Sequence, residues 1–278
     1  MSLSNPVKNY HKLIIVLALF VSACSTNKYA ATEKVYKEKA KGFSKIILST
    51  PPEGQLYDSI NAANQQWVGS VNFGIRKPNF VIIHHTAQDS LGQTIRTFHS
   101  TKAGTSAHYV VGRDGKVVHM VNDYLRANHA GVSKWGKDTD LNSSSIGIEM
   151  DNNGTTDIWT DAQINSLLKL LATLKTSYNI PTANFIGHAD IAPKRKPDPN
   201  NFPWKKLAEK GFGYWYDEVL KNPPADFDTT NALKLIGYDT SDLGAAITAF
   251  KRHFIQSDIT PKLTPVDILV LYNVYTKY

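Results

Sequence analysis

The chain has 278 residues, 42% of them apolar and 20% charged, which allows one sizeable hydrophobic core plus a smaller one and excludes a wholly disordered chain. Its 31 Lys and Arg against 24 Asp and Glu give a formal charge of +7, but the basic residues are dispersed, so we expect no nucleic-acid partner and favour a polyanionic surface as neighbour. The single cysteine, Cys24, excludes intramolecular disulfides and cysteine-rich metal clusters, so any metal site must use histidine and carboxylate ligands.

The N-terminus has the features of a secretion signal. Lys8 and Lys12 precede an apolar run of nine residues at 13–21, which is too short to cross a bilayer core of about 30 Å as a helix. The run ends in Val21-Ser22-Ala23-Cys24, which resembles a bacterial lipobox. We therefore expect a lipoprotein signal peptide over 1–23 and a mature chain anchored to a membrane by a lipid on Cys24. The alternative is an ordinary signal peptide with an incidental cysteine.

A tether is predicted next, over residues 24–55. This stretch is polar, rich in Lys, Ala and Thr, and has little hydrophobic periodicity. Such a tether lets a folded domain reach a substrate beyond the membrane.

A domain of mixed α/β class is predicted over residues 56–222. Short β-type runs alternate with helical segments there, at 80–83, 108–111, 116–121, 146–148 and 184–186. The turn Gly112-Arg113-Asp114-Gly115 joins the second and third runs and predicts an antiparallel hairpin. We expect a mixed central β-sheet flanked by helices.

Helical patterns dominate the rest of the chain. The clearest helix is predicted over 161–178, where leucines share one face and Thr160 with Gln163 forms a capping box. Beyond Pro223-Pro224 only helical patterns occur, at 231–237, at 243–254 and in a last helix that Thr264 caps with Pro265 in its first position. We expect a small all-helical C-terminal domain over 223–278.

Polar side chains follow three of the predicted strands, at the points where the strands end. His84-His85 follows the run at 80–83, Glu149 follows 146–148, and residues 187–199 follow 184–186. Two imidazoles and a carboxylate from separate loops can hold Zn²⁺ with a fourth position open, as a hydrolytic site requires, and His84, His188 and Asp198 could supply them. Neighbours on a strand point to opposite faces, so this pattern does not choose between His84 and His85.

Five separated motifs then appear in one characteristic order. They are His84-His85-Thr86-Ala87, Ser106-Ala107-His108-Tyr109, Asn128-His129-Ala130-Gly131, Ser145-Ile146-Gly147-Ile148-Glu149, and Gly187-His188-Ala189-Asp190-Ile191-Ala192-Pro193 with Arg195-Lys196-Pro197-Asp198-Pro199. Together they resemble the zinc-dependent N-acetylmuramoyl-L-alanine amidases of the amidase-2 group, relatives of the peptidoglycan recognition proteins. The resemblance covers roughly half of the chain, from about residue 80 to 215.

The resemblance implies a reaction and a set of roles. The bond to be hydrolysed is the amide between N-acetylmuramic acid, in its ordinary or 1,6-anhydro form, and L-alanine of the stem peptide. Zinc is the implied cofactor, with His84, His188 and Asp198 as its ligands. Glu149 is expected to transfer a proton from water to the leaving amine, and Lys196 to face the developing oxyanion.

The resemblance also implies substrate contacts. His129 is expected to contact the sugar or peptide and Arg195 a stem-peptide carboxylate, with loop packing and simple solvent exposure as the respective alternatives. Two residues depart from the usual pattern: Pro197 stands where a small or acidic residue is common, and Asn200 where glycine is common. Both changes put the shape of the active-site loop in doubt.

The lipobox and the helical tail resemble those of lipoprotein amidases in Gram-negative envelopes. This implies an outer-membrane location facing the periplasm and a peptidoglycan-binding-like role for 223–278, whose alternative is a domain that merely packs on its neighbour. For the whole protein, two other functions stay open: a muropeptide-binding module without catalysis, and a zinc hydrolase acting on a different amide.

Overall fold

The computed structural model describes residues 27–48, 70 and 75–278. The predicted signal peptide, its lipobox and Cys24 lie outside the described residues, as does part of the predicted tether. The chain divides into two compact units, residues 1–72 and 73–278.

Residues 75–278 combine strands and helices as expected. The strands are β1 (Phe80–His85), β2 (Tyr109–Val111), β3 (Val117–His119), β4 (Ser145–Met150) and β5 (Phe185–Gly187). The helices are α3 (Leu91–His99), α4 (Leu141–Ser144), α5 (Asp161–Tyr178), the 3-10 turn η4 (Thr182–Asn184), α6 (His188–Ile191), α7 (Trp204–Ala208), α8 (Thr229–Ile236), α9 (Leu243–Phe254) and α10 (Pro265–Tyr275). The short helices α3, α4, α6 and α7 were not predicted from the sequence.

The five strands form one mixed sheet in the order β3-β2-β4-β1-β5. The pairs β2–β4, β4–β1 and β1–β5 are parallel, while β3 runs antiparallel to β2. The predicted hairpin and the mixed character of the sheet are therefore confirmed. β1 lies between β4 and β5, so its C-terminal end is flanked by the ends of both neighbours.

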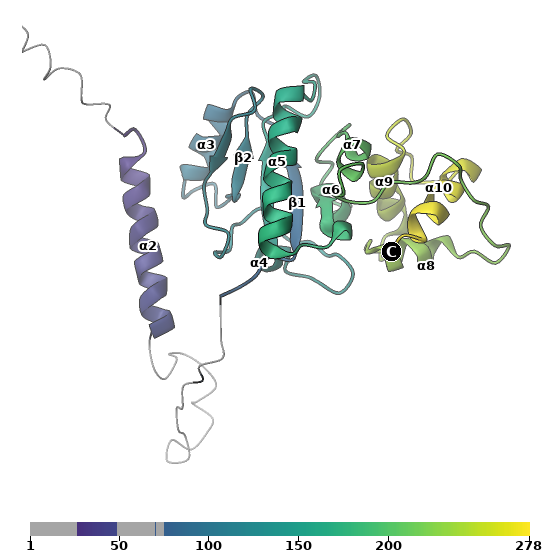
Figure 1. The fold of residues 1–278 in the computed structure, drawn as a ribbon, viewed down its shortest axis with the longest axis horizontal. Helices are drawn as coiled ribbons and strands as arrows, with labels where there is room; N and C mark the ends of the chain where they lie inside the picture. The colour runs from purple at the N-terminus through teal and green to yellow at the C-terminus, as the bar shows by residue number, and fades with distance from the viewer. Residues whose placement is uncertain (1–26, 49–69, 71–74) are drawn as a thin grey trace, which may run out of the picture. The chain divides into compact units, whose positions relative to one another are not determined.

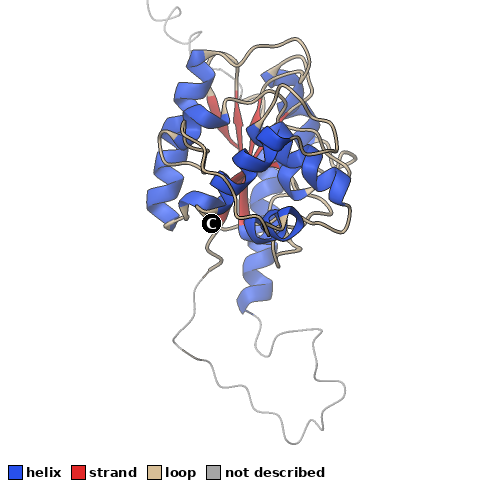
Figure 2. Ribbon diagram, turned by 90° about the vertical axis from the view of Figure 1, so that its right-hand side faces the viewer, coloured by secondary structure: helices blue, strands red, loops and turns tan. Residues whose placement is uncertain are grey.

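Alternate residues of β1 face two different hydrophobic cores. Val81 and Ile83 pack in a core with Leu167 and Leu171 of α5. Ile82, on the opposite face, belongs to a core that includes residues of α8, α9 and α10. Figure 1 shows α5 lying along the sheet and α8, α9 and α10 grouped at the end of the chain, and Figure 2 shows the strands surrounded by helices.

Helix α5 begins and ends where the sequence predicts, but its capping differs. Thr160 accepts a hydrogen bond from the backbone N–H of Gln163, as in a capping box. The Gln163 side chain does not return to the cap. Its buried amide instead donates to the carbonyls of Val111 and Asp151, at 3.1 and 3.0 Å, and so ties α5 to the ends of β2 and β4. Hydrogen bonds to two buried carbonyls contribute more to stability than one contact at the exposed helix cap would, because an unpaired buried carbonyl is costly.

The C-terminal helices share a core with the sheet. Leu233 of α8, Phe250 of α9 and Leu271 of α10 pack in the same cluster as Ile82 and Ile186. Thr264 and Asp267 form a full capping box at the start of α10, with Pro265 next, as predicted. Helices are present where the all-helical segment was expected, and the domain boundary at 222/223 stays a prediction.

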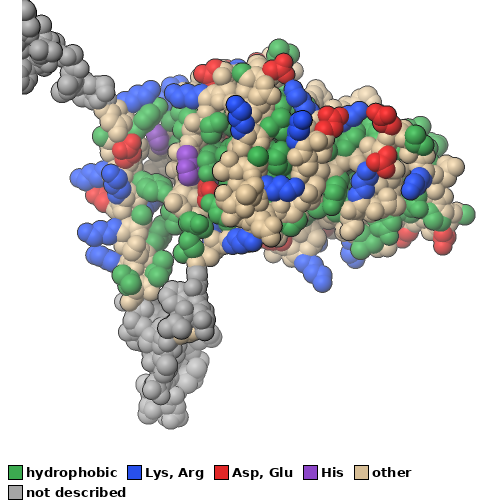
Figure 3. Space-filling model, viewed as in Figure 1, with side chains coloured by type: hydrophobic (Ala, Val, Ile, Leu, Met, Phe, Trp, Pro, Cys, Tyr) green, Lys and Arg blue, Asp and Glu red, His purple; other side chains and the backbone are tan. Residues whose placement is uncertain are grey.

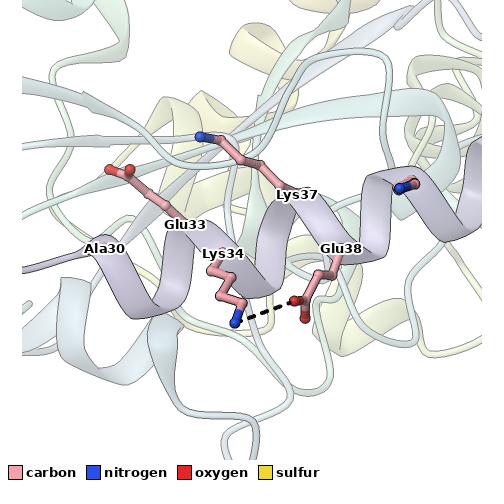
Figure 4. Close-up of a pocket in the computed structure, with 6 residues that line it drawn as sticks. Ala30, Glu33, Lys34, Lys37 and Glu38 are labelled. Carbon is pink, nitrogen blue, oxygen red and sulfur yellow. Dashed lines mark ion pairs between the residues drawn. The ribbon is translucent and has the colours of Figure 1, made fainter.

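A separate helix, α2 (Ala30–Leu48), lies in the range predicted as a tether. Its Lys, Glu and Ala residues have high helix propensity, and Lys34 pairs with Glu38 one turn on at 4.0 Å. Figure 4 shows this pair beside Ala30, Glu33 and Lys37 along a shallow hollow on the helix. None of the predicted site residues lines that hollow. No helix among the described residues combines the length and apolar character that crossing a bilayer demands.

Charges are interspersed on the surface of residues 75–278. On the face shown in Figure 3, Lys and Arg side chains alternate with Asp and Glu, without a large area of one sign. This arrangement matches the dispersion of basic residues along the sequence.

Candidate metal centre

Three neighbouring parallel strands end at one edge of the sheet and bring the predicted site residues together. In the β1–β4 register His84 stands opposite Glu149, so the two side chains share a face of the sheet. In the β1–β5 register Ile83 stands opposite Gly187, and His188 is the first residue beyond β5. Parallel pairing therefore places both histidines and the acid beside each other.

The donor atoms of His84, His188 and Asp198 converge. His84 Nδ1 lies 2.9 Å from His188 Nδ1, and Asp198 Oδ2 lies 3.0 Å from His188 Nδ1 and 3.3 Å from His84 Nδ1. Ligand atoms about 2.0–2.1 Å from a tetrahedral zinc are about 3.3 Å apart, so these separations fit three corners of a tetrahedron. All three residues are buried, and they form the one such group of potential ligands within the described ranges.

The structure distinguishes His84 from His85. His84 points to the same face as Ile82 and meets His188, whereas His85 points to the opposite side of the strand. There the His85 ring lies against Gly154, and its Nδ1 accepts the backbone N–H of Asn200 at 3.2 Å. His84 is therefore the metal ligand candidate.

The donor set has the chemistry of a cation site. His188 Nε2 lies 3.1 Å from the carbonyl oxygen of Ala130, which can only accept, so the neutral ring carries its proton on Nε2. Its Nδ1 then presents a lone pair to the carboxylate of Asp198. Two electron-rich atoms at 3.0 Å repel each other unless a cation lies between them, so the residues present fit a zinc ion.

The protonation states also suit a metal. Burial, followed by the neighbouring ring of His188, lowers the pKa of His84 to about 4, so the His84 ring is neutral at neutral pH. Burial opposes the ionisation of Asp198, yet the adjoining rings of His188 and His84 hold its pKa below the ordinary range. A neutral imidazole and an ionised carboxylate are the forms that bind metals.

Glu149 has one carboxyl oxygen without a partner. Its Oε2 is buried and makes no hydrogen bond to any described residue. Burial raises the pKa of Glu149 to about 8, the charge of Asp198 raises it too, and that of Lys196 lowers it. A carboxyl group that exchanges its proton near neutral pH is suited to general acid–base work.

Lys196 lies two residues before Asp198 and is half-buried. Its ammonium charge acts on both Glu149 and His84, lowering the pKa of each. We find no hydrogen bond or ion pair from its Nζ within the described part of the chain. The loop thus brings a positive charge to the site without neutralising it.

Asn200 explains how the loop after Asp198 is held. Its side-chain oxygen accepts from Arg252 Nη1 of α9 at 3.1 Å, and its amide donates to the Gly154 carbonyl at 3.2 Å. A glycine would lack both bonds. The other departure, Pro197, is exposed while its neighbour Asp198 is buried, so it leaves the ligand inside the site.

His129 occupies a different place from the one expected of a substrate contact. It is 8% exposed and lies under His84, with its Nδ1 3.0 Å from His84 Nε2 and its Nε2 3.2 Å from Ser145 Oγ. Both ring nitrogens are thus engaged within the protein, as the alternative of packing expects. The predicted contact of His129 with the sugar or peptide stays a prediction.

Arg195 bridges two loops. Its Nη2 donates to the carbonyls of Ala130 and Val132, each at 2.9 Å, although the residue is exposed. Gly131 has φ +59°, and a Cβ there would lie 3.0 Å from this Nη2. The predicted contact of Arg195 with a stem-peptide carboxylate stays a prediction.

Asp190 is a residue of the site that sequence reasoning missed. Its Oδ1 accepts from the Tyr238 hydroxyl at 2.8 Å, and its Oδ2 accepts from His253 Nδ1 at 2.8 Å and from the Gly187 N–H at 2.7 Å. The C-terminal segment therefore fixes the short helix that begins with His188. The motif that contains Asp190 is visible in the sequence. Its partners Tyr238 and His253 lie 48 and 63 residues further on, and no sequence pattern connects them to Asp190.

Comparison with known proteins gives a consistent family. Residues 74–201 match the model of the family described as N-acetylmuramoyl-L-alanine amidase. The chain is 34% identical over 206 residues to the N-acetylmuramoyl-L-alanine amidase AmiD of Escherichia coli (strain K12), covering 63% of this chain and 74% of that protein. It is 42% identical over 103 residues to the 1,6-anhydro-N-acetylmuramyl-L-alanine amidase AmpD of Salmonella typhimurium (strain SL1344), covering 37% of this chain and 54% of that relative.

Two solved structures extend the likeness to the C-terminal helices. The E. coli AmiD complex with the substrate anhydro-N-acetylmuramic acid-L-Ala-D-gamma-Glu-L-Lys has a TM-score of 0.65 at 28% identity, covering 76% of this chain and 93% of that one. AmpDh3 of Pseudomonas aeruginosa in complex with anhydromuramic pentapeptide has a TM-score of 0.66 at 27% identity, covering 79% and 99%. Each match covers more than nine tenths of the solved chain and about three quarters of this one.

Proposed function

The chain belongs to the N-acetylmuramoyl-L-alanine amidases, and from this premise we propose that it is a zinc enzyme that releases stem peptides from muropeptides. The observation that carries the proposal is the convergence of His84, His188 and Asp198 beside the carboxyl group of Glu149, whose Oε2 is buried. Two related structures hold anhydromuramyl peptides, which supports the same class of substrate here.

The metal and the protein divide the chemistry. Held by His84, His188 and Asp198, zinc would supply a Lewis acid that activates water at neutral pH. Glu149 takes the proton of the attacking water and delivers it to the leaving amine of L-alanine. Its unpartnered Oε2 leaves room for that exchange.

Lys196 stabilises the charge that develops on the carbonyl oxygen. Its ammonium group already lies in the field of Glu149 and His84 and has no ion-pair partner among the described residues. A preorganised donor of this kind typically contributes on the order of 100-fold in rate.

The test uses the purified full chain with two substrates, intact sacculi and released anhydro-muropeptides. We expect about one zinc per chain by elemental analysis, and mass spectrometry should detect free stem peptide with an N-terminal alanine. Glu149→Gln should keep zinc and lose on the order of 100-fold or more in activity, whereas His188→Ala should lose both. Full activity in Glu149→Gln, or cleavage at another bond, contradicts the proposal.

A lipid anchor is the second part of the proposal. We propose that Cys24 is acylated and that the protein faces the periplasm from the outer membrane, on the strength of the apolar run at 13–21 and the lipobox that follows it. In a Gram-negative host the wild-type chain should incorporate a palmitate label and sediment with outer membranes. Cys24→Ser should do neither, and an unlabelled wild-type chain would remove the anchor.

A muropeptide-binding module without catalysis is the competing function. No observation favours it, since Glu149 and Lys196 both lie at the candidate metal centre. Tight binding of anhydro-muropeptides by a zinc-loaded chain that releases no alanine-terminated peptide would support it.

A further inference from the structure

We propose that one loop, residues 128–131, sets the orientation and the tautomer of both imidazole ligands, with His129 as the positioning residue for His84 and the Ala130 carbonyl as that for His188. This inference rests on the proposed function, because it takes His84 and His188 to be zinc ligands. It assigns to His129 a role inside the protein.

A continuous chain of hydrogen bonds runs away from His84. His84 Nε2 lies 3.0 Å from His129 Nδ1, and His129 Nε2 lies 3.2 Å from Ser145 Oγ. The Ser145 hydroxyl donates to the carbonyl of Leu141. His84, His129 and Ser145 are all buried, so water does not replace these partners.

The end of this chain fixes the direction of every bond in it. The Leu141 carbonyl can only accept, so the Ser145 hydroxyl must spend its proton there and can only accept from His129. His129 therefore carries its proton on Nε2 and accepts at Nδ1. His84 must then donate from Nε2, which leaves its Nδ1 as a lone pair beside Asp198 and His188.

The next residue of the loop does the same for the second ligand. The Ala130 carbonyl accepts from His188 Nε2 at 3.1 Å, and it also accepts from Arg195 Nη2 at 2.9 Å. His188 thus presents Nδ1 as well. His84 and His188 therefore both offer Nδ1 to the metal, because the adjacent loop residues His129 and Ala130 accept hydrogen bonds from their Nε2 atoms.

The loop itself is held by a buried amide. The Asn142 side-chain oxygen accepts the backbone N–H groups of His129 and Ala130, at 2.9 and 2.8 Å. Asn142 lies in α4, one residue after Leu141 and three residues before Ser145, where β4 begins. The start of β4 therefore holds both the backbone of the loop and the far end of the His129 chain.

A glycine makes room for the imidazole of His129. A Cβ on Gly147 would lie 2.3 Å from Cγ of His129, a separation that no side chain tolerates. This close approach of ring and strand confines His129 to one position under His84. The His129 ring packs directly on the backbone of Gly147, so any larger residue at position 147 would displace the ring.

The first experiment reads the tautomers directly, without a variant. Long-range ¹H–¹⁵N spectra of the zinc-loaded full chain should show His84 and His188 bound through Nδ1 with protons on Nε2, and His129 protonated on Nε2 alone. Ligation of either ring through Nε2, or a proton on His129 Nδ1, overturns the proposal. A chain that takes up no zinc overturns the proposed function instead, so the two failures are distinct.

The second experiment measures zinc affinity by competition with a chromogenic chelator. His129→Phe keeps the ring shape without its nitrogens and should weaken zinc binding by about 10- to 100-fold. His129→Gln can accept from His84 and donate to Ser145, so it should restore most of that loss. His119→Gln, on the half-exposed ring of β3, is the matched control and should bind as the wild type.

Ser145→Ala gives an independent reading if His129→Phe folds poorly. It removes the acceptor for His129 Nε2 and should weaken zinc binding by a smaller factor than His129→Phe does. Circular dichroism of the metal-free variants checks the fold. Wild-type zinc affinity in folded Ser145→Ala and His129→Phe, or equal losses in His129→Phe and His129→Gln, contradicts the positioning role.

Discussion

Two buried clusters of charged side chains in the same molecule satisfy their hydrogen bonds to very different degrees. Lys251 of α9 is fully buried, and its Nζ donates to Asp258, to Thr260 and Lys262 at 3.1 and 2.9 Å, and contacts Asp267 at 3.1 Å. The metal centre is buried to a similar extent. There, Glu149 has a carboxyl oxygen without a partner, and the nitrogens of His84 and His188 face each other at 2.9 Å.

This difference separates a structural cluster from a functional one. Every N–H of the Lys251 ammonium group has an acceptor within the protein, so this cluster needs no ligand to complete its hydrogen bonds. At the metal centre the lone pairs and the spare oxygen outnumber the protons, and the arrangement costs folding free energy until a cation arrives. The convergence of several buried donor atoms that lack protons therefore distinguishes the candidate metal centre from the Lys251 cluster.

Removing the metal should give the largest effect and separates the two clusters most sharply. Dialysis against a chelator should abolish activity, and added zinc should restore it. Zinc at about 100 times its dissociation constant should also stabilise the fold by about 2.7 kcal/mol, measured as a rise in melting temperature. A chelator-treated chain with full activity would show that the site needs no cation.

Breaking the structural cluster should reduce stability and leave the chemistry intact. Lys251→Met leaves the buried carboxylate of Asp267 without its cation and should destabilise the fold by about 3 kcal/mol in urea unfolding. Lys169→Met, on the exposed side of α5, should change stability by no more than about 0.5 kcal/mol. The activity of Lys251→Met per folded molecule should match that of the wild type. A lower activity would show that the Lys251 cluster also affects the chemistry at the metal centre.

Tyr238→Phe addresses the link between the C-terminal segment and the metal centre. It deletes one bond to the buried carboxylate of Asp190 and should cost about 2 kcal/mol, because that bond has a charged acceptor. Urea unfolding measures the loss, with Tyr272→Phe as the control on α10. Equal stability of the two variants would mean that the bond to Asp190 contributes nothing.

The smallest effect concerns the pH dependence of the Lys251 cluster. Hydrogen bonds from Lys251 and then Thr260 lower the pKa of Asp258 to about 2 from a usual 3.8. Because the folded value is the lower one, this stabilisation is complete above about pH 4 and is lost as the pH falls toward 2. The difference in melting temperature between wild type and Asp258→Asn should shrink over that interval, and a constant difference contradicts the assignment.

Much of the metal centre could be predicted because strand ends and side-chain order are local properties. The strand that carries His84 and the acid after 146–148 are visible as apolar runs followed by polar residues. The choice between His84 and His85 required the sheet, because only the packing of Ile82 and Ile83 shows which face each ring joins.

Other features depend on contacts between distant parts of the chain. His129 looked like a loop residue, since nothing in the motif shows that it lies over the bare backbone of Gly147. The bonds from Tyr238 and His253 to Asp190 needed the placement of the C-terminal helices. Helix α2 was missed because its apolar residues bury nothing, so its helicity comes from intrinsic propensity, which periodicity does not reveal.

The core shared by Ile82, Ile186 and the last three helices has a consequence for biosynthesis. The sheet face that carries Ile82 and Ile186 lacks part of its apolar cover until Leu271 and Val274 have left the ribosome, since both pack in that cluster. A product of premature termination would present this bare face to proteases and to other unfinished chains. Synthesis of α10 is thus the step that completes this core.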